Sequence, residues 1–253
     1  MTSRKPDTPS LDREFSQFTR RGSSLPRHAC EHYGQAVDAK LEIIKQCKDC
    51  DSIRDYGGLY LVFGRYLLEP AVELGCSFAS EVDVTPVKEF DAAIDDATAK
   101  CPSLEVEFVH ADFREQETFS SLRPTDISIL FEVLLHQENY VQVIKNVASR
   151  TSKYVCVAQP CMREEHFNMP DSAVMLQFYD PRLKEMLREG SFWPSDEIHP
   201  DRFSPAAWMW GHSTSHLISI FHGLGWEPEA GSVLEGTFGT YWEFPVIRFK
   251  PMD

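Results

Sequence analysis

Hydrophobic positions recur with a helical period through several segments of the chain. Between residues 11 and 47, apolar and aromatic side chains return every three or four positions, which predicts helices. Pro26 divides this region into at least two helices, because proline breaks a helix interior. The same spacing predicts helices over 59–74, 87–99, 140–149 and 213–222. Gly75 and Gly223 follow two of them and mark their ends.

Short apolar runs typical of buried strands alternate with these helices. The candidate strands cover residues 51–54, 77–84, 106–110, 126–133, 154–159, 226–234 and 240–249. Continuous apolar runs separated by helices indicate a parallel sheet covered on both faces. The last two strands follow each other without a helix, which predicts an antiparallel edge. The predicted fold class is therefore α/β: a doubly wound, Rossmann-like, seven-stranded and mostly parallel sheet with an antiparallel edge strand, plus N-terminal helices.

The predicted organisation is a single large α/β domain with additions. We expect residues 1–12 to be a disordered tail, 13–50 a helical cover, and 51–253 the α/β domain. We interpret an irregular segment rich in aromatic residues, at about 161–210, as an insert in that domain. No repeat or Gly/Ser-rich linker divides the chain, and 253 residues with 42% hydrophobic content suffice for one core.

The charge and composition of the chain disfavour some classes of binding partner. The formal net charge of −14 disfavours nucleic acid and anionic membrane surfaces, both of which repel an acidic protein. The apolar stretches are too short to span a bilayer, and the polar first residues do not resemble a secretory signal. We therefore expect a cytoplasmic protein without nucleic-acid or membrane partners; a homodimer is compatible with the sequence.

The seven cysteines predict reduced thiols, since an odd number spread over a long chain does not suit a disulfide framework. His28, Cys30 and His32 precede Cys47-x-x-Cys50 and are residue types that bind zinc. However, Cys47 and Cys50 lie one turn apart in a helical pattern, and no second cysteine pair is present. We expect helical thiols and no metal site.

Candidate ligand-binding residues follow the first three strands of the sheet. In an open α/β sheet the ligand lies beyond the carboxyl ends of the strands. The first strand leads into Asp55, Gly57 and Gly58, where glycines permit close approach of the backbone to a ligand. Asp83 ends the second strand, and Asp112 with Phe113 follows the third. An alternative for Asp55 and Asp83 is helix capping or turn formation.

Five segments in this order resemble the motifs of class I S-adenosylmethionine (SAM)-dependent methyltransferases. They are residues 52–58, 81–86, 110–113, 126–136 and 210–226. The resemblance implies SAM as cofactor, bound by the residues Asp55, Gly57, Gly58, Asp83, Asp112, Phe113, Phe131 and Glu132. Asp83 would bind the ribose, Asp112 and Phe113 would lie on the adenine side, and the fourth strand would lie beside the methionine part.

The first of these motifs departs from the family pattern. The family commonly has Asp/Glu-x-Gly-x-Gly-x-Gly, whereas Leu59, Tyr60 and Leu61 follow Gly58 here. A different alignment would make 59–63 the strand and Phe63-Gly64-Arg65 the glycine turn. We prefer Asp55, because this alignment supplies the acid and leaves a periodic helix directly behind the glycines.

Aromatic residues and two histidines are candidates for the acceptor side. Tyr179, Trp193, Trp208 and Trp210 in the insert, with Tyr33 in the N-terminal cover, are candidate substrate-binding residues, since ligand pockets are mostly apolar. The alternative is that these rings pack the last helix onto the sheet. His136 and His212 are candidate catalytic bases, needed only if the acceptor must lose a proton; otherwise they are structural.

The predicted function is methyl transfer from SAM to an O, N or C atom of a small molecule. A rival uses SAM as substrate, cyclising or cleaving it, and a third hypothesis is a non-catalytic binding or scaffold protein that kept the fold. A nicotinamide-dependent dehydrogenase is disfavoured, because no Gly-x-Gly-x-x-Gly follows the first strand.

Overall fold

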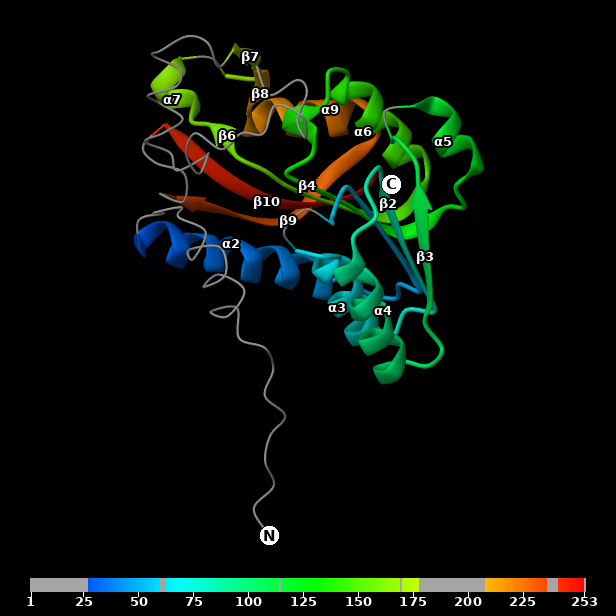
Figure 1. Cartoon of the computed structure of the whole chain (residues 1–253). Helices are drawn as coiled ribbons and strands as arrows, with labels where there is room; N and C mark the ends of the chain where they lie inside the picture. The colour runs from blue at the N-terminus through cyan, green and yellow to red at the C-terminus, as the bar shows by residue number, and fades with distance from the viewer. Residues whose placement is uncertain are drawn as a thin grey trace.

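The computed structural model describes residues 27–59, 62–113, 115–168, 170–177, 208–235 and 241–252 (Figure 1). Its helices are α2 (Arg27–Lys45), α3 (Arg65–Leu74), α4 (Lys88–Lys100), α5 (Gln116–Ser121), the short 3-10 helix η1 (Leu134–His136), α6 (Tyr140–Ser149), α7 (Glu164–Phe167) and α9 (Thr214–Gly223). Its strands are β1 (Ser52–Tyr56), β2 (Phe78–Asp83), β3 (Glu105–His110), β4 (Thr125–Phe131), β5 (Thr151–Ala158), β6 (Cys161–Met162), β7 (Ala173–Gln177), β8 (Trp208–Ser213), β9 (Trp226–Glu235) and β10 (Trp242–Pro251).

The strands form one sheet in the order β3-β2-β1-β4-β5-β10-β6-β8-β7, with β9 paired to β10. Strands β1 to β5 are mutually parallel, whereas β10 runs antiparallel to both β5 and β9. The predicted mostly parallel, Rossmann-like sheet with an antiparallel edge is therefore confirmed. The order of the strands reverses between β1 and β4, which is where such sheets bind ligands.

The number of strands differs from the prediction of seven, since ten strands form the sheet of the described residues. The additional strands β6, β7 and β8 lie in or next to the segment predicted to be an irregular insert. Only two residues make up β6, and β7 pairs with β8 far along the sequence. Strand β6 is too short to show a period, whereas the apolar run of β7, Ala-Val-Met-Leu-Gln, is a local signal that the prediction missed. Residues 178–207 of the predicted insert lie outside the described residues, as does the predicted tail at 1–12.

Helix α3 begins later than predicted. The described residues between Gly57 and Gly64 form turns, and α3 begins only at Arg65. The prediction of a helix directly behind Gly58 is therefore wrong, and so is the alternative of a strand over 59–63. Gly64 has φ 76°, and a Cβ there would lie 2.3 Å from the Phe90 ring. This left-handed glycine allows the chain to turn into the helix while α4 packs against it.

Helices cover both faces of the sheet (Figure 1). On one face, α2, α3 and α4 contribute core residues that include Val37, Leu67 and Phe90. On the other face, α5, α6 and α9 contribute a second cluster that includes Ile144 and Phe221. Each such buried side chain contributes about 1.5–3 kcal/mol relative to exposure. None of the helices in the described residues is long and apolar enough to cross a bilayer.

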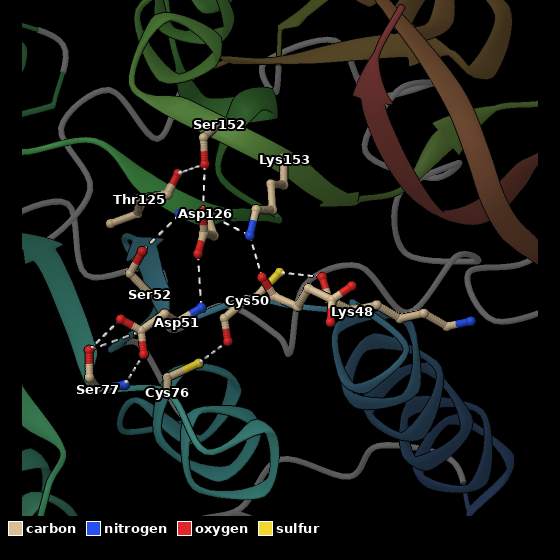
Figure 2. Close-up of polar contacts among 11 residues, drawn as sticks. Lys48, Cys50, Asp51, Ser52, Cys76, Ser77, Thr125, Asp126, Ser152 and Lys153 are labelled. Atoms are coloured by element: carbon tan, nitrogen blue, oxygen red, sulfur yellow. Dashed lines mark hydrogen bonds and ion pairs between the residues drawn. The ribbon is translucent and has the colours of Figure 1, made fainter.

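A polar network ties together the amino ends of four strands (Figure 2). The Asp126 carboxylate accepts a 2.8 Å hydrogen bond from the Asp51 amide and one of 2.6 Å from the Ser152 hydroxyl. The Asp126 amide donates to the Ser52 hydroxyl over 2.9 Å, and the Ser77 amide donates to the Asp51 carboxylate over 3.1 Å. The network fixes the relative positions of β1, β2, β4 and β5, and hence aligns their carboxyl ends at the opposite edge.

Candidate functional site

The loop after β1 passes close to the loops that follow β3 and β4. Gly57 has φ 79°, and its amide donates to the Val82 carbonyl over 2.9 Å. A Cβ at this position would lie 2.9 Å from the Val133 side chain and 3.3 Å from the Phe113 ring. Both the backbone conformation and the lack of space therefore require glycine here.

Two carboxyl groups from neighbouring strands lie beneath the next glycine. Asp55 of β1 stands opposite Glu81 of β2 in the parallel ladder. The Gly58 amide donates to Oε1 of Glu81 over 2.9 Å, and a Cβ at Gly58 would lie only 1.9 Å from Oδ2 of Asp55. The loop is thus seated directly on this pair of acids.

Burial raises the pKa of both acids. Asp55 is 1% exposed, and burial raises its pKa to about 7; the Tyr56 amide and the Lys40 ammonium oppose the rise, and the charge of Asp83 adds to it. Burial also raises the pKa of Glu81 well above its usual value, and the neighbouring Asp55 adds to this rise. Burial thus favours the protonated form of both carboxyl groups, and Asp55 is close to its midpoint near neutral pH.

Asp83 ends β2 at the surface of the same loop. Its Oδ1 accepts a 3.0 Å hydrogen bond from the Thr85 amide, and its side chain is half-buried. Burial raises the pKa of Asp83, while the backbone amides of Thr85, Leu59 and Val84 oppose this rise. The position suits a carboxylate that accepts hydrogen bonds from ligand hydroxyl groups.

Asp112 and Phe113 follow β3, as predicted. Asp112 is half-buried, and its carbonyl accepts a 2.9 Å hydrogen bond from the Thr118 hydroxyl at the start of α5. Phe113 is 8% exposed and packs edge-on against Tyr56, with 6.0 Å between ring centroids. The ring belongs to the core cluster and forms one wall beside Gly57.

Glu132 directly follows β4 in a left-handed conformation, with φ 57°. Its amide donates to the Ala158 carbonyl over 2.7 Å, which holds the end of β4 against β5. Its carboxylate forms an ion pair with the Lys40 ammonium of α2. A non-glycine residue in this conformation costs about 1–3 kcal/mol, and such strain is often found at binding sites.

The Lys40 ammonium is enclosed by aromatic rings beneath the site. The side chain is 1% exposed, and Nζ lies 5.1 Å from the Tyr66 centroid, 5.6 Å from Phe131 and 5.1 Å from Phe244. Cation–π attraction and the Glu132 carboxylate together compensate the buried charge. The same ammonium acts to lower the pKa of Asp55.

The two predicted histidines lie beyond the carboxyl end of β4. His136 is in η1; burial lowers its pKa to about 4, although the Glu132 charge opposes this. His212 of β8 is fully buried, and its Nδ1 lies 2.8 Å from the Gln159 amide nitrogen. Burial, together with His216, lowers the pKa of His212 to about 3. Both imidazoles are therefore neutral and weakly basic near neutral pH.

A tyrosine and a further histidine adjoin His212. The Tyr140 hydroxyl lies 2.8 Å from Nε2 of His216, whose Nδ1 lies 4.0 Å from the Asp171 carboxylate. The Tyr140 ring contacts His212 and Trp210, with centroids 4.4 and 5.3 Å apart. The structure thus brings the predicted Trp210 and His212 together around Tyr140.

Several predicted residues lie outside the described side chains, and several site residues were not predicted. Tyr179 and Trp193 lie outside the described residues; α2 contains Tyr33 and β8 contains Trp208, but their side chains are not described. The residues that sequence reasoning missed are Lys40, Glu81, Tyr140, Asp171 and His216. Lys40 and Glu81 are charged residues within apolar stripes, a pattern that becomes informative only once their partners are known.

Several solved structures with a similar fold are methyltransferases. No family model and no curated protein matches the sequence. Magnesium protoporphyrin IX methyltransferase from Synechocystis, with bound S-adenosylhomocysteine (SAH), has a TM-score of 0.54 at 13% identity over 95% of each chain. A 1,6-didemethyltoxoflavin-N1-methyltransferase from Burkholderia thailandensis, with its namesake ligand and SAH, has 0.54 at 11% identity over 100% of this chain and 94% of that one.

A third similar structure is coclaurine N-methyltransferase bound to N-methylheliamine and SAH. Its TM-score is 0.57 at 14% identity, over 84% of this chain and 72% of the other. The fold of this protein is therefore that of the class I SAM-dependent methyltransferases.

Proposed function

We propose that this protein is a SAM-dependent methyltransferase that acts on a small-molecule acceptor. The observation that carries the proposal is the glycine loop seated between Asp55 and Asp83 at the point where the strand order reverses. Ligands bind at this point in open α/β sheets. Methyltransferases with the same fold along nearly the whole chain hold SAM or SAH, which supports the proposal.

The residues that follow the strands would divide the cofactor among them. The backbone of Gly57 and Gly58, with Phe131 at the end of β4 and Glu132 directly after it, would hold the methionine part. Asp83 would accept hydrogen bonds from the ribose hydroxyls, because its carboxylate faces the loop. Asp112 and Phe113 would line the adenine side. When bound, SAM would supply an electrophilic methyl group.

The acceptor would lie over η1 and β8, where His136, Tyr140, Trp210 and His212 gather. Tyr33, Tyr179, Trp193 and Trp208 remain proposed members of its wall. Because buried His136 and His212 are weak bases, we infer that they orient the acceptor more than they remove a proton. In-line displacement at a methyl group gains much of its acceleration from positioning and exclusion of water.

Calorimetric titration with SAM, SAH and NAD tests the proposal. We expect saturable binding of SAM and SAH, no binding of NAD, and loss of binding in Asp83→Ala. The matched control is Asp95→Ala, which removes an exposed carboxylate in the middle of α4 and should bind as the wild type does. Absence of binding by the wild type would overturn the proposal.

Mass spectrometry of the products then separates the rival uses of SAM. With a panel of small phenols, amines and carboxylic acids, SAH together with a methylated acceptor supports methyl transfer. Another adenosyl product formed without an acceptor would show instead that SAM itself is cyclised or cleaved. Tight binding without any product would favour the scaffold hypothesis.

A further inference from the structure

Asp55 and Glu81 form a buried pair that is short of hydrogen bonds. Asp55 is 1% exposed and Glu81 is fully buried. Among the described residues, both Asp55 oxygens and Oε2 of Glu81 lack a well-aligned hydrogen-bond partner. Burying an unpaired charge costs far more than burying a protonated carboxyl group, so burial favours the protonated forms of this pair and a nearby positive charge favours ionisation.

The charged groups around Asp55 do not supply that compensation. Glu81 and Asp83 of β2 are acids, and Tyr66 of α3 presents a phenol. Lys40 of α2 is the cation that faces Asp55, but its ammonium is already paired with Glu132 after β4. Ionisation of Asp55 therefore leaves one negative charge without a partner, directly beneath the loop that carries Gly58.

The two proposed ligands differ by one positive charge. SAM carries a sulfonium in addition to its ammonium and carboxylate groups, whereas the product SAH carries a neutral thioether. A buried negative charge near the ligand therefore stabilises SAM and has little effect on SAH. This step rests on the proposed function, which places the ligand over the loop after β1.

We propose that Asp55, held against the buried Glu81, releases its proton to solvent when SAM binds and keeps it when SAH binds, so that Asp55 makes the site prefer cosubstrate over product. The balance is simple: the neutral carboxyl group and cationic SAM become a carboxylate with bound SAM and one proton in solution. Product release is favoured because methyl transfer removes the positive charge that stabilised the ionised acid.

The proposal sets the direction and size of the pH dependence. The pKa of Asp55 is raised to about 7 by burial. Since SAM selects the ionised form, its dissociation constant should be about tenfold higher at about pH 6 than at about pH 8. SAH should bind with nearly the same affinity over this range, within about twofold.

Calorimetry over this pH range, in buffers of different ionisation enthalpy, counts the protons released on binding. We expect release with SAM and little or none with SAH in the wild-type protein. In Asp55→Asn, SAM binding should weaken and lose its proton release, while SAH binding persists. The matched variant Glu81→Gln keeps a neutral group and the acceptor for the Gly58 amide, so it should retain the wild-type pH dependence.

Equal pH dependence for SAM and SAH would overturn the inference, as would unchanged proton release in Asp55→Asn. The second result would assign the proton to Asp83 or to the ligand's own ammonium. The wild-type comparison of the two ligands decides the matter even if Asp55→Asn fails to fold. Absence of binding by either ligand would overturn the proposed function as well, and is thereby distinguished from failure of the inference alone.

Discussion

Gly58 is a residue at which the candidate site has no room for a side chain. A Cβ there would lie 1.9 Å from the Asp55 carboxylate, so either the loop or the acid must move in Gly58→Ala. Overpacking of this kind costs about 1–3 kcal/mol. We expect a corresponding loss in the free energy of unfolding, measured by urea denaturation, together with weaker SAM binding.

Gly223→Ala is the control for this prediction. Gly223 is the last residue of α9, and no atom lies within 4 Å of a Cβ built there. Alanine should therefore be neutral or stabilise the helix end by up to about 1 kcal/mol. If Gly58→Ala were as stable and bound SAM as tightly as Gly223→Ala, the close approach of loop and acid would be refuted.

Lys40 offers a second prediction at the scale of single residues. Lys40→Met removes the buried ammonium and leaves Glu132 without its ion-pair partner. Since Glu132 is 31% exposed and can reach water, we expect a loss of about 1–3 kcal/mol, less than for a fully buried pair. Urea denaturation of the variant at neutral pH measures this loss.

The double variant Lys40→Met/Glu132→Gln separates the charge from the packing. It removes both charges, so it should be more stable than Lys40→Met alone, and the two single effects should not add. Strict additivity would show that the ion pair contributes nothing and that Lys40 stabilises the fold through its ring contacts only.

At the scale of the elements, Asp126 is the residue of the polar network that joins the amino ends of β1, β4 and β5. Burial acts to raise the pKa of Asp126, but hydrogen bonds from the Asp51 amide and the Ser152 hydroxyl, with the charge of Lys153, lower it overall. Its stabilisation is therefore present above the unfolded-state pKa of about 3.9 and is lost as the pH falls below that value.

Asp126→Ala should reduce the free energy of unfolding by about 0.5–1.5 kcal/mol at neutral pH, because it removes the hydrogen bonds from the Asp51 amide and the Ser152 hydroxyl. Denaturation curves at neutral and acid pH should show the difference from wild type shrinking below about pH 4. Asp95→Ala, at an exposed site in α4, should change stability little at either pH. A deficit in Asp126→Ala that persisted in acid would assign its effect to packing.

Sequence periodicity predicts the elements that bury an apolar face and misses those that exist only through pairing. The seven predicted strands correspond to β1 to β5, β9 and β10. Strands β4, β5 and β10 bury runs of apolar residues, whereas β3 and β9 are largely exposed or half-buried. Strand β6 has two residues and β8 reads Trp-Met-Trp-Gly-His-Ser, so neither has a period that sequence reasoning could detect. The late start of α3 depends on Gly64 packing against Phe90, a tertiary contact.

The residues of the candidate site likewise fall into those that the sequence could predict and those that it could not. Asp83, Asp112 and Glu132 could be placed from sequence, because their position after a strand follows from the order of the elements. Glu81 and Lys40 could not, since a charged residue on an apolar stripe becomes informative only when its partner is known. The structure supplies those partners: Asp55 and the Gly58 amide for Glu81, and Glu132 with three rings for Lys40.

At the scale of the whole molecule, buried acids and buried histidines give the stability of the fold opposite dependences on pH. The pKa of Asp55 is raised in the folded protein, so the stability it gives is present below about pH 3.9 and is lost as the pH rises towards about 7. The pKa of His136 is lowered to about 4, so its contribution is present above about pH 6.5 and is lost as the pH falls.

Above about pH 6.5 the histidine contribution is complete, and the raised pKa values of Asp55, Glu81 and buried thiols such as Cys50 make stability fall as the pH rises. We therefore expect the ligand-free protein to have a lower melting temperature at about pH 8.5 than at about pH 6.5. Asp55→Asn should remove part of this fall and melt higher than wild type in alkali, since no buried charge then forms. Ligand binding adds stability in proportion to the logarithm of ligand concentration over its dissociation constant.

The increase in melting temperature caused by SAM should accordingly be larger at the higher pH, and the increase caused by SAH should change little. Melting curves of wild type and Asp55→Asn, each with and without the two ligands, measure all of these effects in one series. A wild-type melting temperature that rose from about pH 6.5 to about pH 8.5 would show that Asp55 and Glu81 are not the acids that control stability.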